Sequence, residues 1–210
     1  MARALHDVPS AHDGLSLMAA GARGTRDGTM RGMSIVPDTK DWTWVLERPC
    51  PQCGYDAAAV RLEDLPGLFR ENTLAWSTVL DEPRCVVRPD EATWSPLEYA
   101  CHVRDVHRVF AGRVRAMLTE DDPLFENWDQ DAAAVAATYA AQDPATVVVE
   151  LIETGADVAA VYAGVRPDQA ERTGRRSNGS DFTVVSISRY HLHDVVHHLW
   201  DVSGDLPQAP

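Results

Sequence analysis

Four long stretches of this chain repeat apolar residues at helical spacing, and Pro- and Asp-rich joints separate them. They span residues 61–80, 95–119, 143–165 and 183–202, with a shorter Ala-rich stretch over 129–142. A helix with one apolar stripe must bury that stripe against a neighbouring element. The pattern therefore predicts an all-α fold, an antiparallel four-helix bundle with one short extra helix.

Two local patterns refine this prediction. In Ser95-Pro96-Leu97-Glu98 the serine is an N-cap, the proline takes the first helical position and the glutamate completes a capping box. Three consecutive valines at 147–149 are typical of a strand, but they lie inside a long amphipathic period, so we assign them to a helix. The run 174–180 is rich in turn-forming residues and is expected to be an irregular excursion.

The N-terminal region differs from the rest of the 210 residues. Residues 1–38 are rich in Gly, Ala, Arg and Asp and show no sustained periodicity, so we expect a disordered leader there. We expect one helical domain over residues 41–202 and a short tail over 203–210, because this length suits a single domain.

The chain is acidic, with 19 Lys and Arg against 32 Asp and Glu and a net charge of −13. A protein that binds nucleic acid or an anionic membrane surface through its charge needs the opposite sign, so both partner classes are excluded. No apolar run has the length of a membrane span, and the first residues lack the layout of a secretion signal. We expect a cytoplasmic protein that acts on small molecules and forms a homodimer.

Histidines are concentrated in the last predicted helix. His193 and His197 are four residues apart and share a helix face, as do Asp194 and His198 on a face rotated by about 100°. Both pairs flank the apolar stripe of that helix, so periodicity alone leaves the choice between them open. A bundle would bring His102 from the second helix to either pair, and such a set suits Zn, Ni or Fe.

Other polar residues near these positions have two interpretations each. Asp194, Asp201 or Asp105 would accept the second ring N–H of a ligand histidine. We expect His107 to be half-buried on its helix and His191 to lie at the surface or rim.

Several residues are candidates for binding the substrate or lining a pocket. Arginines at 104, 108 and 189 would bind a substrate carboxylate or belong to a solvated face. Tyr190 and Trp200 would line a pocket or pack in the core.

The four cysteines include one C-x-x-C motif, Cys50 and Cys53, within a run of turn-forming residues. Such a motif is one half of a zinc knuckle or a redox pair. No second C-x-x-C follows it in the sequence, so we favour a structural or incidental role.

Two segments give the chain a family resemblance. Residues 94–102, from Trp94 to His102, resemble the second helix of the DinB-like metalloenzyme superfamily, in which a tryptophan leads into a helix with one metal histidine. The segment from His193 to His198 is similar to the last-helix histidine motif of that superfamily, and the run 121–131 resembles its actinobacterial members. The resemblance covers roughly residues 41–202.

The resemblance implies a four-helix bundle that holds one divalent metal with three side chains. When the ligand positions of the superfamily are carried over to this sequence, they fall on His102, His193 and His197. All three ligands are then histidines. If the doubled histidine is aligned by its second member, Asp194 and His198 take the two last-helix positions, which resembles the Glu-and-His arrangement of the related mycothiol-dependent maleylpyruvate isomerases. We favour the first set and keep His198, Asp194 and Asp201 as alternate ligands or residues that orient the ligands.

The function implied is a metal-dependent enzyme that uses a low-molecular-weight thiol such as mycothiol for S-transfer or isomerisation, in preference to hydrolysis. An open metal position would lower the pKa of a bound thiol so that the thiolate attacks an electrophile. Two further classes stay open. One is a metal-binding or stress-associated module without turnover, and the other is a structural bundle without metal.

Overall fold

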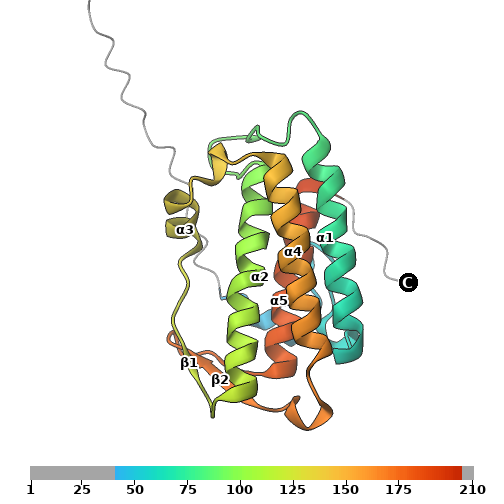
Figure 1. Ribbon diagram of the computed structural model, residues 1–210, viewed down its shortest axis with the longest axis vertical. Helices are drawn as coiled ribbons and strands as arrows, with labels where there is room; N and C mark the ends of the chain where they lie inside the picture. The colour runs from blue at the N-terminus through green and yellow to red at the C-terminus, as the bar shows by residue number, and fades with distance from the viewer. Residues whose placement is uncertain (1–40, 205–210) are drawn as a thin grey trace, which may run out of the picture. The chain divides into compact units, whose positions relative to one another are not determined.

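The computed structural model describes residues 41–204, and the predicted leader over 1–38 and most of the predicted tail lie outside this range. Four long helices run side by side in Figure 1: α1 (Leu65–Asp81), α2 (Pro96–Thr119), α4 (Pro144–Ala163) and α5 (Val184–Ser203). A short helix, α3 (Gln130–Ala136), lies outside the bundle (Figure 1). The predicted four-helix bundle with one short extra helix is confirmed. None of the helices within 41–204 is long and apolar enough to cross a membrane.

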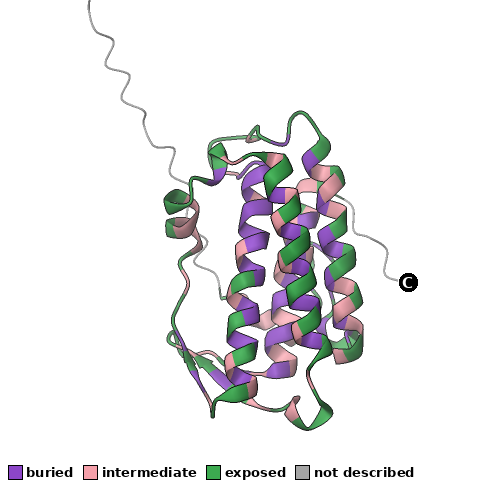
Figure 2. Ribbon diagram, in the orientation of Figure 1, coloured by how far each residue is buried: buried purple, intermediate pink, exposed green. Residues whose placement is uncertain are grey.

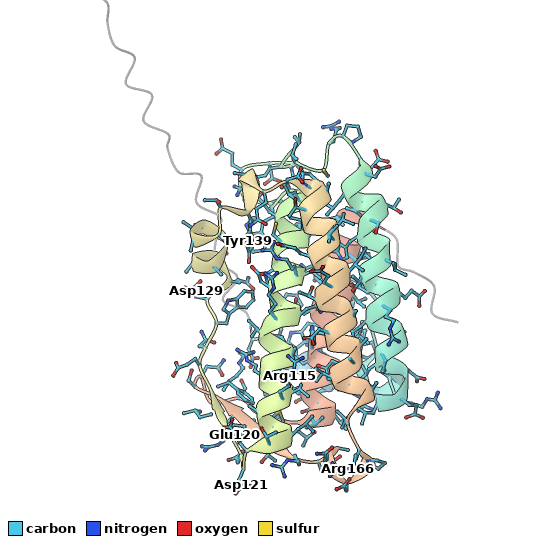
Figure 3. The ribbon with its side chains drawn as sticks, viewed as in Figure 1. Arg115, Glu120, Asp121, Asp129, Tyr139 and Arg166 are labelled. Carbon is cyan, nitrogen blue, oxygen red and sulfur yellow. The ribbon has the colours of Figure 1, made fainter. Side chains whose placement is uncertain are left out.

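The helices are not arranged in chain order. Both α1 and α2 pack against α4 and α5, so α1 and α2 occupy opposite corners of the bundle. Helices α1 and α5 run in one direction and α2 and α4 in the other (Figure 1). The connection over residues 120–143 returns along α2, where the Tyr139 hydroxyl donates to Asp105 Oδ2 at 2.6 Å (Figure 3). This topology places α5 beside α2, the helix with His102.

The predicted capping box starts α2 as expected. The Glu98 backbone N–H donates to Ser95 Oγ at 3.3 Å, and the Ser95 backbone N–H donates to Glu98 Oε2 at 2.9 Å. Thr183 and Ser186 form the same arrangement at the start of α5. These caps fix where both helices begin, and therefore which residues face the interior.

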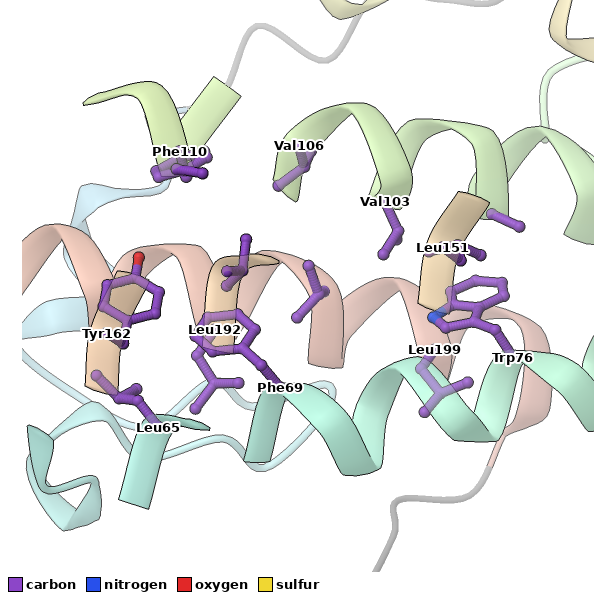
Figure 4. Close-up of a cluster of buried hydrophobic side chains, with 14 of the residues drawn as sticks. Leu65, Phe69, Trp76, Val103, Val106, Phe110, Leu151, Tyr162, Leu192 and Leu199 are labelled. Atoms are coloured by element: carbon purple, nitrogen blue, oxygen red, sulfur yellow. The ribbon is translucent and has the colours of Figure 1, made fainter. Parts of the chain in front are cut away.

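The interior of the four-helix bundle is mainly apolar and closely packed. Buried residues line the inner faces of all four long helices (Figure 2), and Phe69, Trp76, Leu151 and Leu192 meet between them (Figure 4). Helices α1 and α4 approach so closely at Gly155 that an added Cβ atom would lie 2.3 Å from Thr73 Oγ1.

A small sheet closes one end of the bundle, and this was not predicted. Strand β1 (Leu124–Phe125) pairs in parallel with β2 (Thr173–Arg176), which pairs antiparallel with β3 (Asp181–Thr183). The expected irregular excursion over 174–180 is thus mostly a hairpin. The strands of this sheet have only two to four residues, too few to show the alternation of a strand in the sequence. In addition, β1 comes from a distant part of the chain, so no local pattern predicts its pairing. The sheet places the Arg176 guanidinium 5.8 Å from the centre of the Tyr190 ring on α5.

The segment before α1 lies along α5. It contains three short 3₁₀ turns, Thr43–Leu46, Ala57–Ala59 and Leu62–Asp64, so the helix predicted from residue 61 begins at Leu65. The Tyr55 hydroxyl donates to the Arg189 carbonyl at 2.8 Å, and the Arg189 guanidinium donates to the Val60 carbonyl. These bonds hold residues 42–60 against the histidine-bearing helix.

Candidate metal centre

Helix α5 presents its histidines on two faces. One face carries Asp194 and His198 and is directed toward α2, where His102 lies. The other carries His193 and His197 and is directed toward the segment before α1, where the Trp42 ring lies 5.7 Å and 5.1 Å from the two imidazoles. The predicted donors are therefore divided between two groups.

The first group, which we call the cavity cluster, consists of His102, Asp194 and His198. One donor atom from each side chain lies within 4.8 Å of the others, close enough for one cation to bind all three. His102 Nε2 is 3.4 Å from Asp194 Oδ1, and His198 Nε2 is 3.7 Å from the same oxygen. The rings of His102 and His198 are 4.8 Å apart between centroids.

The buried atoms of the cavity cluster fit a cation. His102 is fully buried between the rings of Trp94 and Trp128, at 5.3 Å and 5.4 Å. Its Nε2 lies 3.4 Å from Asp194 Oδ1, too far for a normal hydrogen bond, and neither atom has another hydrogen-bond partner within residues 41–204. Buried polar atoms are rarely left this way, and a bound cation would satisfy both. Two imidazoles and one carboxylate are common ligands of zinc and of iron.

The charge states of the cavity cluster also fit a cation. Burial lowers the pKa of His102 below its ordinary value, so the ring is neutral and able to bind a metal. Burial acts to raise the pKa of Asp194, but His102 and His198 outweigh it and hold that pKa below its usual range. The group therefore combines neutral imidazole with an ionised carboxylate.

Asp201 orients the histidine next to it. Its Oδ2 is 3.0 Å from His198 Nδ1, and because an ionised carboxylate only accepts, Nδ1 carries the proton. The Nε2 atom of His198, 3.7 Å from Asp194 Oδ1, then has no proton, and its lone pair is available to a metal. This is the role predicted for Asp201.

The second group, which we call the knuckle cluster, consists of Cys50, Cys53, His193 and His197, all buried, with one donor atom from each within 4.8 Å of the others. Among residues 41–204, no group of metal donors joins His102 to His193 and His197, the set that we favoured from the sequence. The apolar stripe of α5 has a pair of potential ligands on each side, His193 with His197 and Asp194 with His198, and only the neighbouring elements decide which pair meets α2.

A cavity of about 600 Å³ opens beside the cavity cluster. Its wall includes the cluster residues Asp194 and His198, as well as Asp201. The rest of the wall combines aromatic residues and two arginines with His193, His197 and polar side chains: Trp42, Trp94, Tyr99, Phe110, Trp128, Tyr190, Arg113, Arg176, Asn127, Asp129, Gln130, Asp131 and Asn178. We expected Tyr190 and Trp200 to line a pocket or to pack in the core. Tyr190 lines this cavity, whereas the Trp200 ring packs 5.7 Å from the ring of His197. A cavity of this volume accommodates a small organic ligand.

Two arginines that we did not predict face this cavity. Arg113 is 9% exposed and donates to the Glu126 carbonyl at 3.2 Å, and its pKa is lowered to about 10 by burial and by the nearby charge of Arg176. Within residues 41–204 neither arginine forms a salt bridge with a carboxylate; Asp194 influences Arg113 and Asp41 influences Arg176 through charge alone, and Arg176 Nε donates to Asn178 Oδ1 at 3.3 Å. A buried cation of this kind is typical of a site that binds an anion.

The three arginines predicted as carboxylate receptors lie elsewhere. Arg104 pairs with Asp105 and Glu150, Arg108 pairs with the same two residues, and Arg189 donates to the Val60 carbonyl. Their donors are used within the fold, because the helices that bear them turn these side chains away from the cavity.

The expectations for the other two histidines were wrong. His107 and His191 are both fully buried, and their Nδ1 and Nε2 atoms are 3.0 Å apart. The Tyr162 hydroxyl lies 3.0 Å from His191 Nδ1, so the three side chains form a buried hydrogen-bonded chain. Burial lowers the pKa of His107 from 6.5 to about 4 and that of His191 well below 6.5.

This chain predicts an acid-sensitive fold. A lowered pKa in the folded state means that the neutral ring stabilises the fold above pH 6.5, and that this stabilisation is lost as the pH falls toward 4. From His107 alone we expect the free energy of unfolding to fall by ~3 kcal/mol between neutral pH and pH 4. Urea unfolding of metal-free protein across this range measures the effect. His107→Gln should have a flatter profile, and parallel profiles would contradict the prediction.

Comparison with known proteins identifies relatives. The model of the DinB superfamily matches residues 68–202. The fold is similar to YfiT from Bacillus subtilis, described as a probable metal-dependent hydrolase with an unusual four-helix bundle topology, with a TM-score of 0.63 at 15% identity over 68% of this chain and 84% of that one. It is also similar to the mycothiol-dependent maleylpyruvate isomerase, with a TM-score of 0.55 at 14% identity over 72% of this chain and 67% of that one. A search of curated proteins gave no match.

Proposed function

The chain belongs to the DinB superfamily, and from that premise and the geometry above we propose that it is a metal-dependent enzyme that acts through a low-molecular-weight thiol. The metal ligands in this proposal are His102, Asp194 and His198. This is the alternate set from the sequence, and it replaces the set with His193 and His197. A cytoplasmic location and a homodimer stay predictions.

One observation carries the proposal. His102 Nε2 and Asp194 Oδ1 are buried, face each other at 3.4 Å, and have no hydrogen-bond partner within residues 41–204. Asp194 and His198 line the cavity of about 600 Å³. Trp94 and Trp128, which flank the buried His102 ring, line it too, so a ligand in the cavity would reach a cation bound to the cavity cluster. Leaving two such atoms unsatisfied costs several kcal/mol unless something binds them.

Each residue of the site has a distinct task. A divalent cation bound to the cavity cluster would lower the pKa of a thiol or water molecule beside it. Asp201 holds the proton on His198 Nδ1 and so keeps Nε2 turned toward the site. Trp94 and Trp128 enclose the His102 ring and keep water from its buried side.

The two cavity arginines support an anionic substrate. Arg113 and Arg176 line the same cavity as the cluster, and a guanidinium binds a carboxylate through two parallel hydrogen bonds. We propose that the electrophile carries a carboxylate and that these arginines direct its reactive carbon toward the thiol. The dependence of the neighbouring isomerase on mycothiol and the description of YfiT as a metal-dependent hydrolase support metal-dependent chemistry in this fold.

Turnover by the metal-loaded protein tests this function. We expect S-transfer or isomerisation of a carboxylate-bearing electrophile that depends on added mycothiol or another low-molecular-weight thiol. Turnover of an ester or amide without thiol would instead support hydrolysis. Metal binding without any turnover would support a module without catalysis, and absence of metal would support a structural bundle.

Arg113→Gln tests the substrate class. Because a hydrogen bond between charged groups contributes about 1.5–3 kcal/mol, we expect KM for the carboxylate-bearing electrophile to rise roughly 10- to 100-fold. Arg115→Gln is the matched control, since Arg115 lies on the same helix but is exposed and pairs with Asp157. Equal KM values for Arg113→Gln and the wild type would show that Arg113 binds no substrate.

A further inference from the structure

The C-x-x-C motif forms a tight turn beside α5. The Gly54 backbone N–H donates to the Cys50 carbonyl at 2.8 Å, and the Cys50 N–H donates to the Tyr55 carbonyl at 2.8 Å. Gly54 has a φ of +71°, a left-handed conformation that glycine adopts without a steric penalty. The turn leaves Cys50 and Cys53 1% and 0% exposed, and both thiols are free.

The sequence lacks the second half of this motif, but the fold supplies it from α5. Cys50 Sγ is 3.7 Å from His197 Nδ1, and the donor atoms of both cysteines, His193 and His197 lie within 4.8 Å of one another. His193 is 4% exposed, and its Nε2 is buried with no hydrogen-bond partner in the described part of the chain. Two thiols and two imidazoles thus converge with an unsatisfied nitrogen among them.

We propose that the knuckle cluster is a second metal site, which binds structural zinc through Cys50, Cys53, His193 and His197. Two sulfur and two nitrogen donors in tetrahedral geometry are selective for Zn²⁺, and four protein ligands close the site to substrate. All four residues are buried, and His193 and His197 also reach the wall of the cavity, so it is the complete set of four protein ligands that closes the site. This site shares no ligand with the cavity cluster and does not rest on the proposed function.

Asp201 connects the two sites without binding either metal. Its Oδ1 is 3.7 Å from His197 Nε2 and its Oδ2 is 3.0 Å from His198 Nδ1. His197 therefore directs Nδ1 toward Cys50 and Nε2 toward the carboxylate, the arrangement in which Nδ1 binds a metal.

The zinc would fasten the segment before α1 to α5. Trp42 packs against the rings of His193 and His197 and also lines the cavity. Loss of the zinc therefore loosens one wall of the cavity. Measured effects should include a lower Tm and increased proteolysis within residues 42–60, because structural zinc contributes directly to folding.

Metal stoichiometry and cobalt spectroscopy test the site. Full-length protein purified with zinc under reducing conditions should bind two equivalents. Cys50→Ser and Cys53→Ser should each lose one equivalent, and the cobalt-substituted forms should have a weaker thiolate-to-cobalt charge-transfer band. Cys85→Ser removes a buried thiol outside both clusters and should change neither readout. His102→Ala should lose the other equivalent and keep the band, which separates this site from the proposed enzyme centre.

Two measurements keep the test decisive if a serine variant does not fold. Cys53→His retains a ligand and should keep the zinc with a reduced charge-transfer band. Titration of wild-type protein with a mercurial thiol reagent should release one zinc as the thiols of Cys50 and Cys53 react. The proposal is overturned if folded wild-type protein gives no thiolate-to-cobalt band, if the mercurial releases no zinc, or if Cys50 and Cys53 form a disulfide under these conditions.

Discussion

His102→Ala should remove the metal of the cavity cluster and, with it, thiol-dependent turnover. His102 is the only member of the cluster on α2, so the variant leaves two donors from one helix. Loss of Lewis-acid activation corresponds to several kcal/mol of transition-state stabilisation, and we expect kcat/KM to fall roughly 10³-fold or more. Elemental analysis and steady-state kinetics on the same preparation measure both effects. Activity within tenfold of the wild type would contradict the assignment.

The neighbouring histidines on α5 provide the matched comparison. His198→Ala should reproduce the effect of His102→Ala, because both residues belong to the cavity cluster. His197→Ala should keep the cavity metal and most of the turnover while it loses the knuckle zinc. The reverse outcome would restore the set of His102, His193 and His197 that we favoured from the sequence.

Arg88→Met should lower the free energy of unfolding far more than Arg166→Met, which removes another loop arginine. Glu98 is 4% exposed in its side chain and accepts hydrogen bonds from Arg88 Nε at 2.8 Å and from the Ser95 N–H and hydroxyl at 2.9 Å. Burial acts to raise the pKa of Glu98, but Arg88 and Ser95 outweigh it and lower that pKa. Removing the guanidinium leaves a buried carboxylate without its counter-charge, which costs about 3–5 kcal/mol.

Urea unfolding measures this loss, and two controls interpret it. The double variant Arg88→Met with Glu98→Gln should regain part of the stability, because no buried charge is left unpaired. Arg166→Met removes an ion pair with Asp168 in which both side chains are exposed, and it should cost little stability because solvent screens such a pair. A loss in Arg88→Met no larger than that in Arg166→Met would contradict the role of this pair. Glu98 lies one turn before His102, so the first turn of α2 also positions the metal ligand.

Local signals in the sequence predicted the helices well. Ser95, Pro96 and Glu98 specify the start of α2 through contacts within four residues, and the apolar periods specify the long helices. The strands were missed because their pairing is non-local: Phe125 lies beside Arg176, far along the chain, and no short-range pattern encodes that contact.

The candidate site was predicted in its residues but not in its grouping. The i, i+4 pairs on α5 are symmetric about its apolar stripe, so only tertiary packing decides that Asp194 and His198 face His102. The sequence does contain both halves of the knuckle cluster: the C-x-x-C motif, for which we favoured a structural or incidental role, and the pair of His193 and His197, which we grouped with His102. Their donor types are complementary, since two thiols and two imidazoles form a common zinc site, and this is a signal that could have joined them before the fold was known.

The central claim is that a divalent metal binds among His102, Asp194 and His198. Anomalous diffraction from crystals of the zinc-loaded protein, measured on both sides of the zinc absorption edge, tests it most directly. We predict a zinc peak about 2.0–2.2 Å from His102 Nε2, from His198 Nε2 and from an Asp194 carboxylate oxygen. A zinc peak confined to His193 and His197, with none beside His102, would contradict it.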